Sequence, residues 1–272
     1  MELYYLNSEG EKLDFTKPPY VPRDISELLD YEWGYESEGD GITGFTKEMA
    51  ELSIVLNVFA DDEETYLKAC DRLFTITEKD VIKNAKGRLY YNGQYVLCNL
   101  IGSTKKDWCM GVDFHLCYMR LITDRPVWIK EKEYIFKYSN ITSTNNKNYP
   151  LKYPYRYANG MKIVNVQNDA IDSAHFMLRF YGPAVNPMIT IAGNPYTVHA
   201  VVEAGEYIEI NSLKKTVIKK MITGTEVNLF HYKGKNLFRK ILPGQHVVQC
   251  GNFDFDLTLF EERSEPRWQS SE

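Results

Sequence analysis

Apolar side chains recur at every second position in several stretches of this sequence. The clearest runs are Leu52, Ile54, Leu56 and Val58 in the first half and Phe253, Phe255, Leu257 and Leu259 in the second. A period of two is typical of β-strands with one buried face, because successive side chains of a strand point to opposite sides of its sheet. The 20 tyrosines and an aromatic share of 14% also favour strands. The sequence therefore predicts a mainly β fold in both halves.

One segment follows the helical period instead. Asp61 lies three residues before Glu64, as in a capping box. After these two residues, apolar side chains recur at helical spacing, at Leu67, Cys70, Leu73 and Phe74. The pattern predicts one prominent helix over residues 62–80.

Turn sequences between alternating segments predict β-hairpins. The Asn92-Gly93 pair lies inside residues 88–97 and tolerates the positive φ angles of a two-residue type I′ turn. Residues 193–195 separate two short strands, and the strands 207–211 and 216–220 are expected to pair. Short strands at this regular spacing predict a sandwich of two antiparallel sheets.

The segment from Met110 to Tyr118 is predicted to be a strand with its even-numbered, apolar side chains buried. Asp113, His115 and Cys117 would then share the outward face. They could bind zinc if a fourth ligand came from elsewhere, but the chain has no CxxC pair to support it. We therefore expect an outward strand face, partly covered by a neighbour, and no metal site.

A chain of 272 residues is long for one domain, so two packed units are expected. The polar run 139–150 has too few apolar residues to build structure of its own, and it marks the boundary. The prediction is an N-terminal domain over 1–138, a linker over 139–150, a C-terminal sandwich over 151–268 and a tail over 269–272.

Charge and targeting signals narrow the function classes. A net charge of −5 and a pI near 5.7 give no positive field for holding phosphates, so a sequence-specific nucleic-acid binder is not expected. The five cysteines, an odd number, favour reduced thiols and folding in a cytoplasm. The start lacks the pattern of a signal peptide, and no run approaches the roughly 18 apolar residues of a membrane span.

Catalytic motifs are missing from the sequence. Neither the G-x-S-x-G elbow nor a phosphate-binding glycine loop occurs, and the five histidines are scattered. Carboxylates that could be paired for glycoside hydrolysis alternate with apolar residues, as on solvated strand faces; they are Glu203, Glu206, Glu209, Asp254 and Asp256. We expect no enzyme activity, no catalytic residues and no cofactor.

Tyrosines alternate near the predicted linker, at Tyr153, Tyr155 and Tyr157. Such a stripe could stack on sugars or contact a partner protein, and it could equally pack between domains. It supports an alternative function, a carbohydrate-binding module that contacts the host cell surface.

Several short segments of the second half have an informative order and spacing, although no single one is diagnostic. They are residues 181–189, 193–196, 204–217, 242–244 and 262–268, and their most distinctive residues are Gly182, Pro183, Asn186, Pro187, Gly193, Gly205, Pro243, Gly244, Glu265, Pro266 and Trp268. In these segments the sequence resembles the C-terminal part of phage distal tail proteins, a family of siphovirus tail components. The first half is similar to the same family in outline, through a Gly-containing loop at 37–46, the strand and helix at 51–80, and the closure at 123–129.

The resemblance implies a non-enzymatic structural subunit of the phage tail tip. In that family the N-terminal domain forms a hexameric ring around the tail channel, and a galectin-like C-terminal sandwich projects outward. The implied partners are identical copies in a ring, the tail tube protein, a tail-associated tail-tip protein and the receptor-binding protein, with no membrane insertion. The implied location is the virion tail tip, after synthesis in the bacterial cytoplasm.

Overall fold

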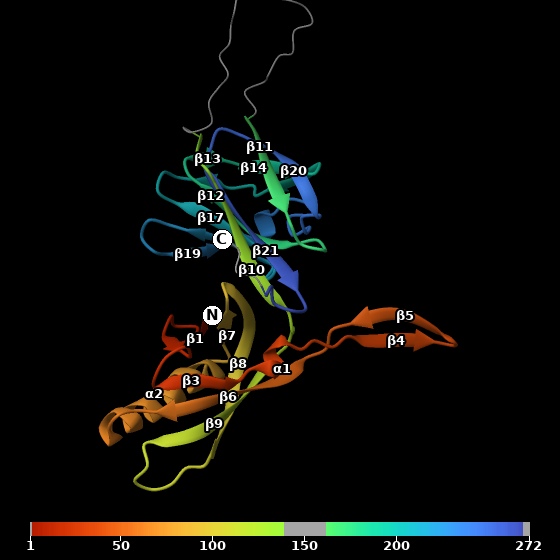
Figure 1. The fold of residues 1–272 in the computed structure, drawn as a ribbon. Coiled ribbons are helices and arrows are strands. Elements are labelled where there is room, and N and C mark those ends of the chain that lie inside the picture. Colours follow the sequence, from red (N-terminus) through yellow and green to blue (C-terminus); the bar gives the residue numbers. More distant parts are fainter. Residues whose placement is uncertain (1, 139–161, 269–272) are drawn as a thin grey trace, which may run out of the picture. The chain divides into compact units, whose positions relative to one another are not determined.

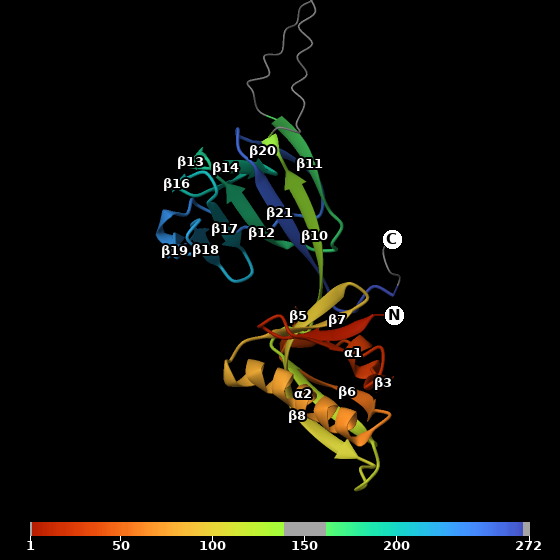
Figure 2. The ribbon, with the colours of Figure 1, turned by 90° about the vertical axis from the view of Figure 1, so that its left-hand side faces the viewer.

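The computed structural model describes residues 2–138 and 162–268, which fold into two compact units (Figure 1, Figure 2). Unit 1 contains Met1–Lys130 and Arg263–Glu272, and unit 2 contains Glu131–Glu262. Strands dominate both units and pair in antiparallel fashion, so the predicted mainly β fold is confirmed.

Unit 1 is a set of strands with two helices, α1 (Ser26–Leu29) and α2 (Glu63–Ile82). Its strands are β1 (Leu3–Leu6), β2 (Lys12–Asp14), β3 (Tyr20–Asp24), β4 (Gly34–Glu38), β5 (Gly41–Thr46), β6 (Ala50–Phe59), β7 (Gly87–Tyr91), β8 (Gln94–Lys106), β9 (Phe114–Thr123) and the start of β10 (Trp128–Phe136).

The long strand β8 belongs to two sheets of unit 1. Its first residues pair with β7 in the order β2-β1-β7-β8, and residues 99–106 pair with β9 in the order β8-β9-β6-β3. The register shifts between Leu100 and Gly102, a β-bulge that bends the strand between its two sheets. Asn92 and Gly93 have φ angles of 46° and 75°, so the predicted β7–β8 hairpin is confirmed.

Helix α2 packs on this bent sheet through one side. It starts one residue later than the capping pattern indicates, because Asp62, rather than Asp61, caps it by accepting a hydrogen bond from the Thr65 amide at 2.8 Å. The hydroxyl of Tyr20 on β3 donates to the Ala69 carbonyl oxygen at 2.7 Å and ties the helix to the sheet. The helix buries Tyr66, Ala69, Leu73 and Ile76 in the core of unit 1.

The buried face of β9 differs from the prediction. The odd-numbered side chains His115, Cys117 and Met119 are buried, because they face α2. Met110 and Val112, which were expected to be buried, precede the strand and lie exposed in the turn between β8 and β9.

Unit 2 is a sandwich of two facing sheets. One has the order β19-β18-β17-β12-β21-β10 and the other the order β15-β14-β20-β11, while β13 and β16 form a separate pair. The strands are β11 (Lys162–Asn168), β12 (His175–Tyr181), β13 (Ala184–Val185), β14 (Met188–Ile191), β15 (Asn194–Thr197), β16 (Val201–Val202), β17 (Tyr207–Asn211), β18 (Thr216–Lys220), β19 (Glu226–Asn228), β20 (Gly244–Cys250) and β21 (Phe255–Arg263), with a short 3-10 helix η2 (Phe230–Tyr232).

The core of unit 2 lies between its sheets and follows the period of two. Every second side chain of β12 is buried, namely Phe176, Leu178 and Phe180. The predicted pairing of 207–211 with 216–220 is present as β17 and β18. From the final strand β21, Phe255 and Leu257 are fully buried in the same core.

The division into units differs from the predicted domain boundaries. Strand β10 crosses from unit 1 into unit 2 without a break, so the boundary lies within it, after Lys130. The C-terminal segment returns to unit 1, where the side-chain amide of Gln94 exchanges hydrogen bonds with the Arg267 backbone at 3.0 and 3.3 Å. The predicted linker 139–150 lies outside the described residues, and the strands that precede and follow it, β10 and β11, pair within sheets of unit 2.

Candidate self-association interface

Strands β4 and β5 form an arm that extends away from the rest of unit 1 (Figure 1). We define the arm as residues 30–49. Its two strands pair with each other and with no other described strand. The sequence prediction of a Gly-containing loop at 37–46 missed this hairpin, whose turn is made possible by Gly39 at a φ of 59°.

The arm exposes several large apolar side chains. Tyr35 and Phe45, which are cross-strand neighbours, are 67% and 65% exposed. Tyr31, Trp33, Ile42 and Met49 are exposed as well. Such a cluster is unusual for a solvated hairpin and is typical of a protein interface, where aromatic residues are enriched.

The base of the arm is fixed to unit 1 by Lys47. Its ammonium group donates a hydrogen bond to the Pro126 carbonyl oxygen at 3.0 Å and lies 4.9 Å from the centre of the Trp33 ring. Burial lowers the pKa of Lys47, and the nearby Arg125 adds to this effect. The arm is therefore anchored at its base.

Carboxylates give the arm a strong negative charge. Lys47 is its one basic residue, and its acidic residues are Asp30, Glu32, Glu36, Glu38, Asp40 and Glu48. Within the described parts of the chain, none of these carboxylates forms an ion pair. The excess charge is thus uncompensated in a single copy.

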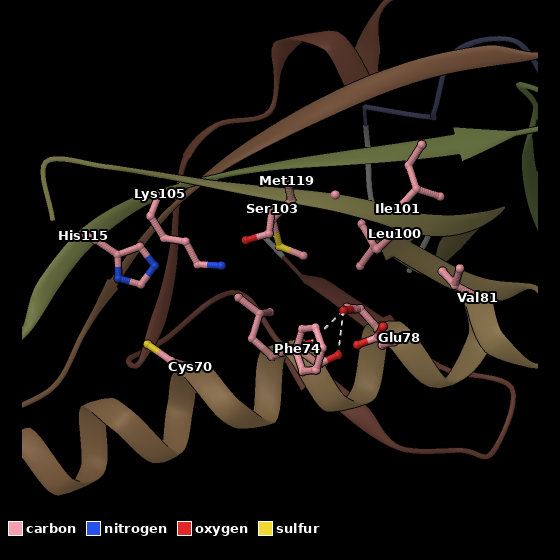
Figure 3. A pocket seen from close by; sticks show the side chains of 13 residues that line it. Cys70, Phe74, Glu78, Val81, Leu100, Ile101, Ser103, Lys105, His115 and Met119 are labelled. Atoms are coloured by element: carbon pink, nitrogen blue, oxygen red, sulfur yellow. Dashed lines mark hydrogen bonds between the residues drawn. The ribbon is translucent and has the colours of Figure 1, made fainter.

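A groove of about 250 Å³ lies between α2 and β8 (Figure 3). Helix α2 contributes Phe74 and Val81, and β8 contributes Ile101 and Lys105, with His115 of β9 at one end. The lining is mostly apolar, and Phe74 is 63% exposed. Helix α2 carries apolar side chains beyond the side that packs on the sheet, and these side chains form part of the groove lining.

The apolar surface continues beyond the groove in both directions. On α2, the exposed side chains Leu67 and Ile82 extend the apolar surface along the helix. In the turn between β8 and β9, Trp108 and Met110 are exposed. Of the apolar residues that indicated the helix, Leu67 and Phe74 are exposed. The residues that α2 buries in the core include Tyr66, Ala69 and Ile76.

His115 is a buried polar residue that lines this groove. Its Nδ1 lies 2.7 Å from the Tyr66 hydroxyl oxygen, and its Nε2 is buried without a hydrogen-bond partner among the described residues. Burial, together with the positive charge of Lys105, lowers the pKa of His115. Burial raises the pKa of Tyr66 to about 12, so the hydroxyl stays protonated at neutral pH.

We expect His115 to make the protein less stable in mild acid. Because the pKa of His115 is lower in the folded chain than the ordinary histidine value of about 6.5, the unfolded chain binds more protons below that pH. The free energy of unfolding should fall from pH 7 towards pH 5, by up to about 1.4 kcal/mol per pH unit more than in His115→Gln. Urea unfolding across this pH range measures the difference.

The exposed His231 provides the matched control for this pH dependence. His231→Gln should show the same pH dependence as the wild type. Equal slopes for the wild type and His115→Gln would contradict the assigned role of His115.

In unit 2, two of the distinctive residues that carry the family resemblance, Gly182 and Gly205, lie where two segments of the chain meet. Gly182, which directly follows β12, donates a hydrogen bond from its amide to the Glu206 carbonyl oxygen at 3.0 Å. Gly205 precedes Glu206 with a φ of 82°. The Glu206 carboxylate pairs with Lys219 at 2.6 Å and accepts from the Glu203 amide at 3.0 Å, and these contacts lower its pKa.

The other distinctive residues that carry the family resemblance are dispersed over the structure. Pro183, Asn186 and Pro187 lie between β12 and β14, Gly193 is in the β14–β15 turn, and Pro243 and Gly244 lie at the start of β20. Glu265, Pro266 and Trp268 belong to unit 1, where the Trp268 Nε1 donates to Glu265 at 2.6 Å. These residues shape turns and the chain end rather than one common site.

The remaining carboxylates considered for catalysis have structural contacts. Glu209 pairs with Arg179 at 2.8 Å, and Asp256 accepts from the Tyr181 hydroxyl at 2.6 Å. Asp254 accepts from the Tyr138 amide at 2.7 Å. Within residues 2–138 and 162–268, no three His, Cys, Asp or Glu side chains converge as metal ligands, and no helix is long and apolar enough to cross a membrane.

The tyrosine stripe of the alternative function lies outside the described residues, because Tyr153, Tyr155 and Tyr157 fall between residues 139 and 161. Unit 2 has a groove of about 500 Å³ beside β14 and β20, lined among others by Pro183, Asn186 and Phe253.

Three solved phage structures share this fold. A chain of the phage P2 baseplate in its activated conformation with calcium is 14% identical, with a TM-score of 0.63 over 98% of this chain and 100% of that one. A phage p2 baseplate chain determined with strontium, also 14% identical, gives 0.62 over 97% and 99%. The Dit protein of phage SPP1, described as a paradigm of the hub adsorption apparatus in phages that infect Gram-positive bacteria, is 13% identical and gives 0.54 over 97% and 100%.

No protein-family model and no curated protein matches the sequence. At these identities the solved structures show a shared fold. The resemblance to phage distal tail proteins that was inferred from the sequence is thus confirmed at the level of the fold, over nearly the whole chain.

Proposed function

We propose that the protein is a structural hub subunit of a phage tail tip. The observation that carries this proposal is the fold, which is shared along nearly the full chain with the hub protein of phage SPP1 and with baseplate chains of phage P2. Both solved chains are matched over their full length, across the two units of this protein. A match of this extent supports the same kind of role, whereas a match to one unit alone would indicate only a shared domain.

In the proposed assembly, unit 1 forms a ring of six copies that joins the tail tube to the tail-tip and receptor-binding proteins. A ring needs two different contact surfaces on each copy, because a head-to-tail contact repeats until the rotation closes. The arm and the groove beside α2 supply two such surfaces within unit 1. Unit 2 is then available for neighbouring tail-tip proteins.

The charge of the chain suits a ring through which DNA passes. The net charge of −5 opposes binding of the phosphate backbone, whose affinity for proteins depends on neutralising lysines and arginines. Four of the carboxylates considered for catalysis have structural partners, which supports a non-enzymatic role without a cofactor; they are Glu206, Glu209, Asp254 and Asp256.

We expect the purified protein to form rings at high concentration or on assembly into tails. Light scattering should give a particle of six times the 31.6 kDa chain mass, and negative-stain electron microscopy should show a central hole. Immunogold labelling of purified virions should place the protein at the tail tip. Monomers at every concentration, together with absence from purified tails, would contradict the proposal.

A further inference from the structure

We infer that unit 2 binds a neutral saccharide in the groove beside β14 and β20. We call this surface the β14–β20 groove. Its volume of about 500 Å³ lies within the range of small-molecule sites in proteins, roughly 300–1,000 Å³. The side chains in it that could bind a ligand are Asn186, Met188, Thr190, Gln249, Asn252 and Phe253. All of its described lining residues belong to unit 2 of one copy, so the site requires neither the ring nor the hub role.

The floor of the β14–β20 groove is the outer face of a sheet. In β14, Ile189 and Ile191 are buried in the core of unit 2, so Met188 and Thr190 lie on the opposite face. Gln249 of β20 is exposed as the cross-strand neighbour of Thr190. Pairing of the two strands therefore brings a thioether, a hydroxyl and an amide to one surface.

The rest of the lining comes from the chain segments before β14 and after β20, at residues 183–186 and 250–253. The first segment is held by its backbone. Strand β13 pairs with β16, and the amide of Asn186 donates a hydrogen bond to the Ala200 carbonyl oxygen at 2.9 Å. These contacts leave the side chain of Asn186 available, and they shape this side of the groove before a ligand arrives.

Four polar side chains of the groove have no partner within the described chain. None of the side chains of Asn186, Thr190, Gln249 and Asn252 forms a hydrogen bond with another described residue. Each amide offers two donor hydrogens and an acceptor oxygen, and the threonine hydroxyl both donates and accepts. Sugars present neighbouring hydroxyl groups that also donate and accept, so these side chains match them.

An aromatic ring and a thioether supply the apolar part of the site. The ring of Phe253 is half-buried and packs on Phe180, with ring centres 5.4 Å apart and an angle of 90° between the rings. Gly251 leaves room beside this ring, because an added Cβ atom would lie 3.1 Å from its Cε1. Met188 is 45% exposed. The C–H face of a sugar ring can pack on such an apolar surface.

The β14–β20 groove is uncharged. None of its described lining residues is acidic or basic, although charged residues make up 25% of the sequence. Proteins bind ionic ligands through opposite charges and charge-assisted hydrogen bonds, and the described lining offers no such partner. The lining therefore favours neutral saccharides over phosphorylated, sulfated or uronic acid saccharides.

The sheet around the groove disfavours an extended peptide as the ligand. Strand β14 pairs with β15 and β20, and β20 pairs with β14 and β11, so both strands have a partner on each side. A peptide that adds to a sheet gains affinity from the backbone groups of a free strand edge, which this groove lacks. A saccharide binds through side-chain amides and an apolar surface, and both are present.

A printed array of neutral and acidic bacterial surface glycans tests the ligand class with the full-length protein. We expect at least one neutral glycan to bind and the acidic glycans to give no signal above the blank. Isothermal titration calorimetry with the bound glycan then measures its Kd.

The methyl group of Met188 reports whether the β14–β20 groove is the site. In protein labelled at its methionine methyl groups, the bound glycan should shift the nuclear magnetic resonance signal of Met188. The signal of Met110, which is 92% exposed in unit 1, should stay unchanged.

Removal of the amides tests their role in binding. Gln249→Ala and Asn252→Ala should each raise the Kd about 3-fold or more, and the double variant should raise it at least about 10-fold, because each loses hydrogen bonds to the sugar. Gln245→Ala is the matched control, since Gln245 is an exposed glutamine of the same strand outside the described lining. It should leave the Kd unchanged, and circular dichroism with the Tm verifies that each variant is folded.

Three results would overturn the assignment of a neutral saccharide to this groove. They are binding of no neutral glycan on the array, binding of acidic glycans alone, and binding of a neutral glycan that leaves both the Met188 signal and the Kd of Gln249→Ala unaffected. The hub role is tested separately, by ring formation and by labelling of virions. Failure of either claim is therefore distinguishable from failure of the other.

Discussion

Replacing Gly182 with alanine is expected to destabilise unit 2 by about 3 kcal/mol or more. A Cβ atom at this position would lie 1.9 Å from the Glu203 carbonyl oxygen and 2.8 Å from that of Val202. Both are backbone atoms, so no rotation of a side chain relieves the overlap. The Gly182 amide also donates to the Glu206 carbonyl oxygen, which holds the two chain segments together at this distance.

Thermal and urea unfolding of the full-length protein measure the effect. Gly41→Ala is the matched control, because Gly41 has no heavy atom within 4 Å of its added Cβ. It should unfold like the wild type within about 0.5 kcal/mol, as exposed substitutions usually do. A loss below about 1 kcal/mol for Gly182→Ala would show that the backbone around Glu203 can move aside, against the packing described here.

The second large effect is expected in unit 1, from Tyr5→Phe. Asp80 of α2 is fully buried, and its carboxylate accepts from the Tyr5 hydroxyl at 2.5 Å and from the Ser8 amide at 2.9 Å. Burial and this hydrogen bond raise the pKa of Tyr5, so the hydroxyl remains a donor. Removing one oxygen atom leaves a buried carboxylate oxygen without its donor, which costs about 2–3 kcal/mol.

Urea unfolding of unit 1, followed by far-ultraviolet circular dichroism, measures this loss. Tyr35→Phe removes the same oxygen from an exposed ring of the arm and should change the free energy of unfolding by less than about 0.5 kcal/mol. Asp80→Asn in the Tyr5→Phe background should not add a full second penalty, since the two groups act on one contact. Equal stability of Tyr5→Phe and the wild type would show that water satisfies Asp80.

The fold was predictable where local signals and burial agree. The Asn92-Gly93 turn and the strands β6 and β17 each depend on neighbouring residues, and each is present as predicted. Helix α2 was also predictable, because a capping residue and a helical period occur together. These signals act within a few residues, so the sequence contains them in readable form.

The faces of β9 and α2 depended on tertiary contacts instead. His115 is polar, but Tyr66 provides it with a hydrogen bond, and the strand can therefore turn that side to the helix. Phe74 is apolar and exposed because a second surface on α2 remains uncovered in one copy. Hydrophobicity alone assigns such residues to the opposite faces.

The arm was the main feature that the sequence analysis missed. Its glycines and carboxylates resemble a solvated loop, and the aromatic residues between them contribute no core in a single chain. One signal for the arm was nevertheless present in the sequence, since aromatic and acidic residues alternate over residues 30–38. An exposed apolar surface leaves this kind of contradiction in the sequence, because its residues are apolar and yet contribute to no core of the described chain.

In the order of the chain, unit 2 is a domain inserted into unit 1. Unit 2 is one uninterrupted stretch, entered through β10 and left through β21, whereas unit 1 includes residues from both ends of the described chain. During synthesis, unit 1 is completed only after all of unit 2 has left the ribosome. The reason is that its last segment, which Gln94 holds through Arg267, follows unit 2 in the chain. The same order along the chain allows the stretch between β10 and β21 to be replaced by another domain while unit 1 keeps all of its own residues.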